Sequence, residues 1–111
     1  MEQKRVLIVD DSPTLRRSIK LLLSKTDVVV LEAGNEIGMY NQIENYGKAV
    51  DLIIMDLALK EENGLELVSK LKKSEKYSAI PILILTDNSN LENVLQARQL
   101  GVQGYIKKDA Q

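Results

Sequence analysis

The stretch 51–56, in which four apolar residues run without a break into Asp56, constrains the fold of this chain more than any other feature. A continuous apolar run of this length, with two isoleucines, is typical of a β-strand that is buried on both faces of its sheet. An acid at the carboxyl end of such a strand lies at the rim of the sheet, where open α/β sheets bind ligands and carry out chemistry. We therefore take Asp56 as the candidate reactive group.

Four further apolar runs and four helical patterns accompany this stretch. The predicted strands cover residues 5–9, 28–31, 51–56, 80–85 and 102–107. The residues at helical spacing are Leu15, Ile19, Leu22 and Leu23 in a helix over 13–25, Ile37, Tyr40, Ile43 and Tyr46 in a second helix that closes near Gly47, Leu65, Val68 and Leu71 in a third, and Leu91, Val94 and Leu95 in a fourth. The first helix is expected to bury one stripe of these residues. Strands that alternate with helices favour a parallel sheet with right-handed crossovers.

Three short motifs mark the ends of the predicted helices. Ser12-Pro13 is a good N-cap followed by proline at the first helical position. Asn63-Gly64 indicates a turn before the third helix. Gly101 after Leu100 is typical of a helix C-cap.

Composition limits the function classes that the chain can serve. Its 111 residues suffice for one domain with a single core. The chain has no cysteine and no histidine, so any bound metal must be held by oxygen. A net charge of −1 and the absence of Trp and Phe give no basis for binding nucleic acid. We see neither a membrane-spanning stretch nor a signal peptide, and we expect the chain to be cytoplasmic.

Polar side chains with complementary chemistry follow the predicted strands. Asp10 and Asp11 follow the first strand, Asp56 ends the third, Thr86 the fourth and Lys108 the fifth. Because the carboxyl ends of parallel strands share one edge, three carboxylates, a hydroxyl and an ammonium should gather there.

This set of groups predicts phosphoryl chemistry. Three close carboxylates repel one another unless a cation neutralises them, and Mg²⁺ is bound by one or two carboxylates together with phosphate oxygens. A carboxylate beside Mg²⁺ and Lys108 is placed to attack phosphorus, while the hydroxyl of Thr86 can bond a phosphoryl oxygen. The product would be an aspartyl phosphate on Asp56. The carboxylate needs no general base because it is already ionised at neutral pH.

The motifs of the chain closely resemble those of the response-regulator receiver domain of two-component signalling. They are Leu7-Ile8-Val9-Asp10-Asp11-Ser12, Met55-Asp56-Leu57, Asn63-Gly64-Leu65-Glu66-Leu67, Ile84-Leu85-Thr86 and Gly104-Tyr105-Ile106-Lys107-Lys108. The resemblance covers nearly all 111 residues in order. It implies a doubly wound, flavodoxin-like sheet of five parallel strands in the order 2-1-3-4-5. It also implies that a sensor histidine kinase or phosphotransfer protein donates a phosphoryl group to Asp56, and that the change controls an output domain or protein.

The resemblance also implies a metal site and a switch. Asp10, Asp11 and Asp56 look like the Mg²⁺-binding acids, and the backbone carbonyl of Ala58 would complete the protein ligands.

Thr86 looks like the switch hydroxyl, Tyr105 the switch aromatic and Lys108 the phosphate-pairing lysine. Lys108 is preferred to Lys107 because the lysine of the family lies three residues after the aromatic. The chain would catalyse only its own phosphorylation and dephosphorylation, without being an enzyme that acts on other molecules.

Four features depart from the family pattern. Asp109 stands where the family usually has proline after the lysine, Lys60 stands where it has proline four residues past the acceptor, and Asp87 replaces a small residue after Thr86. These three residues bear on how readily the chain is phosphorylated. The fifth helix of the family is missing after residue 111, which indicates a truncated receiver domain or a following region that covers the sheet. The apolar patch left exposed would favour dimers.

Other function classes remain open from the sequence alone. A pseudo-receiver would keep the fold as a protein-interaction module without phosphorylation, and Asp87 and Asp109 support it. A haloacid-dehalogenase-like phosphatase would carry a second aspartate two residues after the first, where this chain has Ala58. A flavodoxin-type cofactor binder lacks support because no Ser/Thr/Gly-rich phosphate loop follows the first strand.

Overall fold

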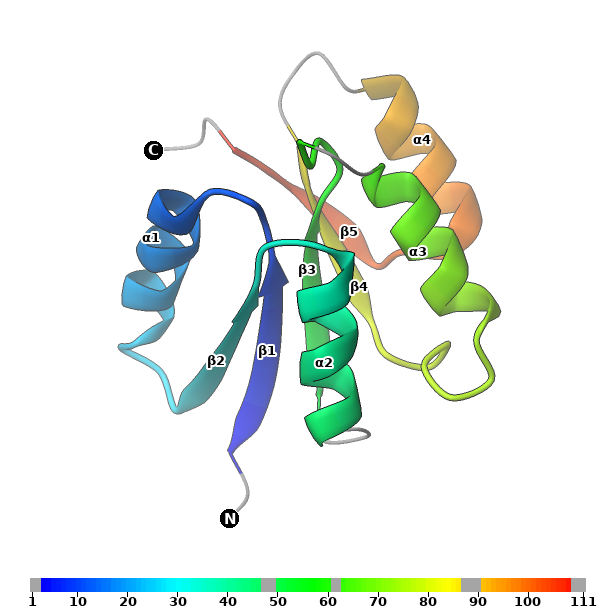
Figure 1. Ribbon diagram of the computed structural model, residues 1–111. Coiled ribbons are helices and arrows are strands. Elements are labelled where there is room, and N and C mark those ends of the chain that lie inside the picture. Colours follow the sequence, from blue (N-terminus) through cyan, green and yellow to red (C-terminus); the bar gives the residue numbers. More distant parts are fainter. Residues whose placement is uncertain (1–2, 47–49, 61–62, 87–90, 109–111) are drawn as a thin grey trace.

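Strands and helices alternate along the whole of the described chain. The computed structural model describes residues 3–46, 50–60, 63–86 and 91–108. Its elements are β1 (Lys4–Val9), α1 (Pro13–Leu23), β2 (Val28–Ala33), α2 (Glu36–Tyr46), β3 (Leu52–Asp56), α3 (Gly64–Lys73), β4 (Ile82–Thr86), α4 (Leu91–Leu100) and β5 (Gly104–Lys107). The five strands are all parallel and lie in the order β2-β1-β3-β4-β5 (Figure 1). The predicted doubly wound fold of order 2-1-3-4-5 is confirmed.

The main core lies between the sheet and three helices on the same face. Figure 1 shows α2, α3 and α4 on one side of the sheet and α1 on the other. Because side chains alternate along a strand, every second strand residue points into this core. The main buried contributions are Leu7 and Val9 from β1, Ile53 and Met55 from β3, Ile82 and Ile84 from β4, Met39 and Ile43 from α2, Leu67, Val68 and Leu71 from α3, and Val94 and Ala97 from α4.

A smaller core lies between the sheet and α1. Val6, Ile8, Ile54 and Leu85 are buried there, and the α1 residues packed against them are the partly buried Leu15, Ile19 and Leu23. The predicted stripe is confirmed only in part, because Leu15, Ile19 and Leu23 pack against this core without being fully buried, whereas Leu22 is 73% exposed. No second helix covers this face within the described residues, so the flank of α1 that carries Leu22 has no packing partner there.

The buried faces of α2 and α4 also differ from the apolar residues that revealed these helices. In α2 the fully buried residues are Met39 and Ile43, whereas Ile37 is exposed. In α4 they are Val94 and Ala97, and Leu95 is 52% exposed. Each helix therefore turns a narrow face toward the sheet and leaves several of its larger apolar residues at the surface.

Local chemistry explains where two elements begin. Strand β4 starts at Ile82, two residues later than predicted, because Pro81 has no N–H to donate. The carbonyl of Pro81 still accepts a hydrogen bond from the Ile53 N–H at 2.9 Å. The Asn63-Gly64 pair does not form a free turn. Asn63 is the N-cap of α3, with its side chain accepting from the Leu65 N–H at 2.9 Å, and Gly64 is the first helical residue.

Helix α4 ends at Leu100, directly before a glycine. Gly101 follows α4 with φ of +99°, which glycine adopts without strain, as expected for a C-cap. Across the part of the chain that the structure describes, no helix combines the length and apolar character needed to cross a bilayer.

The burial of Leu71 and the exposure of Leu22 predict very different costs for the same substitution. Leu71→Ala removes a side chain that is 1% exposed in α3, and we expect it to lower the free energy of unfolding by about 2–5 kcal/mol. Leu22→Ala makes the same change in α1 at a position that is 73% exposed, and should cost less than about 0.5 kcal/mol. Urea unfolding followed by circular dichroism measures both, and equal costs would contradict the described packing.

Candidate functional site

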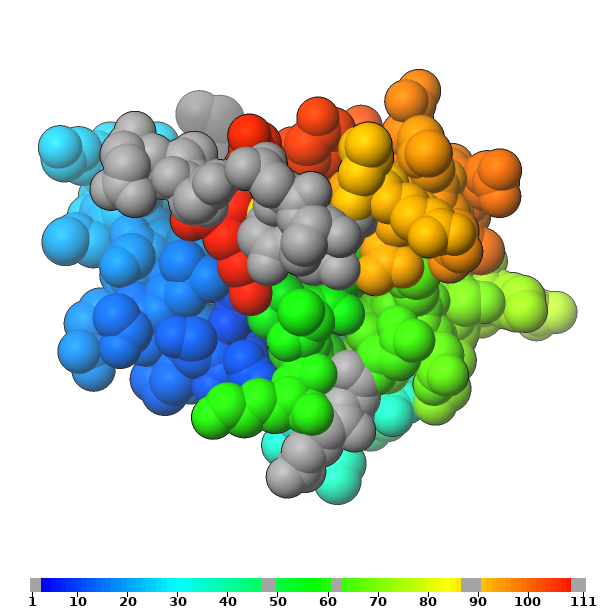
Figure 2. Space-filling model, turned by 90° about the horizontal axis from the view of Figure 1, so that it is seen from above, coloured from blue at the N-terminus to red at the C-terminus, as the bar shows by residue number. Residues whose placement is uncertain are grey.

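Four strands deliver polar groups to one edge of the sheet. Asp10 follows β1, Asp56 is the last residue of β3, Thr86 is the last residue of β4 and Lys108 follows β5. Figure 2 looks down on this edge, where blue, green and red segments from distant parts of the sequence adjoin one another. Asp10, Asp56 and Thr86 are the buried polar side chains of the described residues, with exposures of 0%, 0% and 4%.

Asp10 is fixed by hydrogen bonds at both its backbone and its side chain. Its N–H donates to the carbonyl of Ala33 at 3.0 Å, which continues the pairing of β1 with β2. Its Oδ1 accepts from the Ser12 N–H at 2.8 Å, and the Ser12 hydroxyl in turn caps α1 by accepting from the Leu15 N–H at 3.2 Å. The start of α1 therefore holds the Asp10 carboxylate in place.

Asp56 is held by the turn that follows it. Its Oδ1 accepts from the Ala58 N–H at 2.9 Å, and the N–H of Leu57 donates to the carbonyl of Leu85 at 3.2 Å. These contacts fix the backbone that follows the acid and leave Oδ2 directed at a cation. That cation is Lys108, whose Nζ lies 2.8 Å from Asp56 Oδ2.

Lys108 bridges the two buried acids. Its Nζ also lies 3.5 Å from Asp10 Oδ2, and its backbone N–H donates to the carbonyl of Thr86 at 2.7 Å. The side chain is 27% exposed, so it is less shielded from solvent than the two acids that it contacts. The neighbouring Lys107 lies in β5, pairs in register with Thr86 and is exposed. Of the two adjacent lysines, Lys108 is the one beside the acids.

Burial and charge act on the pKa values of these groups in opposite directions. Burial raises the pKa of the Asp10 carboxyl above its usual value, the hydrogen bond from Ser12 opposes this, and the nearby Asp56 adds to the rise. Burial lowers the pKa of the Lys108 ammonium, but the hydrogen bond and charge of Asp56, together with Asp10, outweigh it and the net pKa is raised. Lys108 therefore stays charged at neutral pH.

The donor set at this edge fits a hard divalent cation. One oxygen from each of Asp10, Asp11 and Asp56 lies within 4.8 Å of the others. Among the described residues, Oδ2 of Asp10 and Oδ2 of Asp56 have no partner except the Lys108 ammonium, although both are buried. Buried carboxylate oxygens with spare acceptor capacity, in a chain that has no histidine or cysteine, suit a hard cation such as Mg²⁺ or Ca²⁺. Whether the carbonyl of Ala58 joins them stays a prediction.

The two predicted switch residues differ in exposure. Thr86 is buried at the end of β4, one residue beyond the position that pairs with Asp56. Tyr105 lies in β5 and is 53% exposed, so its ring is at the surface. Their switching roles stay predictions. Asp87 and Asp109, which depart from the family pattern, lie outside the described residues, whereas Lys60 is described and exposed.

Sequence reasoning missed the part that Gly64 plays. A Cβ at this position would lie 2.3 Å from the Asp56 carbonyl oxygen and 2.6 Å from Leu57 Cα, so the start of α3 packs directly on the backbone of the acceptor. The signal that was available is the glycine itself, which follows a good N-cap and begins a helix where glycine is otherwise unfavourable.

Arg16 was also missed. Its Nη1 donates to the backbone carbonyl of Asp10 at 2.5 Å, and its Nε lies 3.0 Å from Glu32 Oε1. This arginine therefore links the backbone of Asp10, after β1, to Glu32 in β2. No sequence pattern distinguishes it from the adjacent exposed Arg17.

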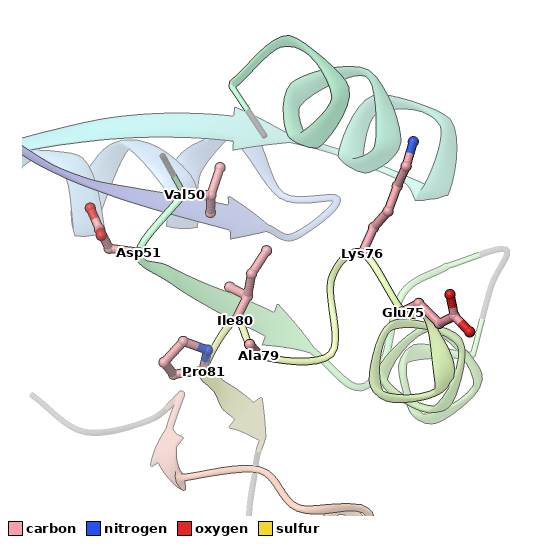
Figure 3. A pocket seen from close by; sticks show the side chains of 7 residues that line it. All are labelled: Val50, Asp51, Glu75, Lys76, Ala79, Ile80 and Pro81. Atoms are coloured by element: carbon pink, nitrogen blue, oxygen red, sulfur yellow. The ribbon is translucent and has the colours of Figure 1, made fainter. Parts of the chain in front are cut away.

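A pocket of about 500 Å³ lies at the opposite edge of the sheet, near the starts of β3 and β4. Its lining residues are Val50, Asp51, Glu75, Lys76, Ala79, Ile80 and Pro81. Figure 3 shows the charged side chains of Asp51, Glu75 and Lys76 pointing in different directions, without converging on a common point. The pocket therefore lacks the convergent polar groups of a ligand site.

Comparisons with known proteins agree with this geometry. The family model of the response regulator receiver domain matches residues 6–111. A chemotaxis protein CheY homolog of Campylobacter jejuni is 36% identical over 105 residues, which cover 94% of this chain and 80% of that protein. The phosphate regulon transcriptional regulatory protein PhoB of Pseudomonas aeruginosa is 34% identical over 97% of this chain and 46% of its own length. The chemotaxis protein CheY4 of Vibrio cholerae shares the fold, with a TM-score of 0.87 at 24% identity over 99% of this chain and 90% of that one.

The close approach at Gly64 predicts a selective cost. We expect Gly64→Ala to lower the free energy of unfolding by about 1–3 kcal/mol, because the added methyl overlaps the backbone of Asp56 and Leu57. Gly38→Ala in α2 is the matched control, since its Cβ would come no closer than 3.3 Å to another atom and alanine favours a helix. Urea unfolding checks both, and a Gly64→Ala variant as stable as Gly38→Ala would contradict the described approach.

The burial of Asp10 predicts that its neutralisation stabilises the metal-free chain. Asp10→Asn keeps the acceptor for the Ser12 N–H and removes a buried charge, so the melting temperature in chelator at neutral pH should rise, by about 4 °C for each 1 kcal/mol. Because the pKa of Asp10 is raised in the folded chain, the free-energy cost of burying its charge is fully present above the folded-state pKa. This cost fades as the pH falls from there toward about 4, the ordinary pKa of aspartate. The rise in melting temperature caused by Asp10→Asn should therefore become smaller over the same pH range.

Glu75→Gln is the control for this experiment, because it removes an exposed carboxylate and should leave the melting temperature unchanged at every pH. Thermal unfolding at several pH values compares the two variants. A lower melting temperature for Asp10→Asn would mean that the attraction of Asp10 to Lys108 exceeds its cost of burial.

Proposed function

The chain belongs to the response regulator receiver domain family, and from this membership we propose that it is a phosphoacceptor signalling domain. Asp56 takes a phosphoryl group from a phosphohistidine of a sensor histidine kinase or phosphotransfer protein, and the phosphorylated state controls an output domain or protein. The observation that carries this proposal is the convergence of Asp10, Asp11 and Asp56 beside Lys108.

Asp56 is the nucleophile in the proposed reaction. One of its carboxylate oxygens attacks phosphorus, a new O–P bond forms, and the N–P bond of the phosphohistidine breaks. The departing imidazole nitrogen keeps the electron pair of that bond and is protonated from solvent. The product is an acyl phosphate. The hydrogen bond from Ala58 to Oδ1 restricts rotation of the carboxylate and supports its role as a positioned nucleophile.

Lys108 is the cation that meets the incoming charge. Its ammonium is already 2.8 Å from Asp56, so the group offsets negative charge on the transferring phosphoryl oxygens without reorganisation. The raised pKa of Lys108 keeps this charge in place at neutral pH.

Mg²⁺ is the proposed cofactor, held by the carboxylates of Asp10, Asp11 and Asp56 with the backbone carbonyl of Ala58. When bound, it supplies positive charge that offsets the phosphoryl oxygens. The chain's own contribution is to keep three acids together and to shield two of them from water.

Thr86 and Tyr105 form the proposed switch. The hydroxyl of Thr86 moves toward a phosphoryl oxygen on Asp56, and the ring of Tyr105 turns inward behind it. Tyr105 is 53% exposed, so its ring is not locked into the core and is free to turn. The surface of α4 and β5 would then differ between the two states, and partners would distinguish them there.

Phosphorylation is tested with acetyl phosphate and Mg²⁺, followed by intact mass spectrometry. We expect wild type to gain about 80 Da, the mass of one phosphoryl group, and Asp56→Asn to gain nothing. A wild-type chain that gains no mass and binds no Mg²⁺ would be a pseudo-receiver. That alternative is not favoured, because every acid required for phosphorylation is present.

The adjacent lysines provide a matched pair for testing the role of the ammonium. We expect Lys108→Ala to slow phosphorylation of Asp56 by about tenfold or more, because it removes the cation beside the acceptor. Lys107→Ala removes an exposed lysine from the neighbouring position and should react at the wild-type rate. Rapid-quench measurement of the phosphorylated fraction decides between them, and equal rates would exclude Lys108 from the reaction.

A further inference from the structure

The loop after β3 reaches the acid cluster through a backbone group. The peptide N–H of Lys60 donates a hydrogen bond to Oδ2 of Asp11, and the N···O distance is 2.7 Å. The two residues are 49 positions apart in the sequence, so the bond joins the loop after β1 to the loop after β3.

The three acids are restrained in different ways. Asp10 and Asp56 are completely buried, each accepts a hydrogen bond from a residue two positions further along its own loop, and both contact Lys108. Asp11 is only partly buried and has no ion pair within the described residues. The orientation of its carboxylate therefore depends on Lys60.

We propose that the peptide N–H of Lys60 is a positioning group for the metal site. It holds one oxygen of Asp11, which keeps this carboxylate close to Asp10 and Asp56 before a divalent cation arrives. The inference deepens the proposed function and rests on the cation site described there. Hydrogen bonds to ligating carboxylates orient them, and their loss typically weakens metal binding by about 10–100-fold.

The backbone and the side chain of Lys60 can be separated by substitution. Lys60→Ala removes the exposed ammonium and keeps the N–H, whereas Lys60→Pro removes both. If the side chain acted by attracting or repelling ions, the two variants would behave alike. If the N–H positions Asp11, only Lys60→Pro should bind Mg²⁺ more weakly than wild type.

Mg²⁺ binding to the full chain, measured by isothermal titration calorimetry, is the primary test. We expect Lys60→Ala to bind Mg²⁺ with a Kd within about twofold of wild type, and Lys60→Pro to bind about tenfold or more weakly. A Lys60→Pro variant that binds Mg²⁺ as tightly as Lys60→Ala, or more tightly, overturns the proposal.

The Mg²⁺ dependence of phosphorylation by acetyl phosphate provides a second readout. For Lys60→Pro, the Mg²⁺ concentration at half-maximal rate should rise in step with the Kd, while the rate at saturating Mg²⁺ stays near that of Lys60→Ala. A general disturbance of the site would lower the saturating rate instead, and this result would also overturn the proposal.

Amide hydrogen exchange keeps the proposal falsifiable if circular dichroism shows that Lys60→Pro does not fold. In metal-free wild type, the Lys60 amide should exchange slowly, and Asp11→Ala should remove this protection. Fast exchange in wild type, or unchanged protection in Asp11→Ala, overturns the inference.

Mg²⁺ binding by wild type distinguishes a failure of the cation site from a failure of the role of Lys60. If it binds no Mg²⁺, the proposed cation site and this inference both fail. If it binds Mg²⁺ and the proline variant binds equally well, only the role of Lys60 fails.

Discussion

The contact between Lys108 Nζ and Asp56 Oδ2 is the interaction on which the functional edge of the sheet depends. Two carboxylates, those of Asp10 and Asp56, are withdrawn from water within a few ångströms of each other, which is costly unless a cation accompanies them. Lys108 contacts both acids, and its side chain remains partly exposed. Its ammonium is thereby present where negative charge from a phosphoryl group would accumulate, so one lysine serves both the fold and the proposed chemistry.

The architecture makes this contact possible by bringing short segments to a common line. Parallel pairing places the ends of β1, β3, β4 and β5 at one edge, and the backbone bond from Lys108 to Thr86 extends the last pairing beyond the strand. Gly64 lets α3 begin directly against the Asp56 backbone. The acceptor is therefore held by its strand, by the turn after it and by the helix that follows.

Much of this could be predicted from the sequence, for identifiable reasons. A buried strand needs a continuous apolar run, so Leu52 to Met55 located β3, and the polar residues that end such runs located the candidate site. The order of the strands came from the resemblance to receiver domains, because the runs themselves do not say which strands are neighbours.

What could not be predicted depends on how distant segments meet. The bond between Lys60 and Asp11 joins two loops, and its donor is a peptide N–H that almost every residue type carries. The exposure of Leu22 is set by what covers α1 rather than by its spacing within the helix. Ribosomal synthesis adds an order of events to this geometry, since a nascent chain contains Asp10, Asp11 and Asp56 well before Lys108. Joining the edge strand β5 to β4 is thus the step that delivers the counter-charge to the buried acids.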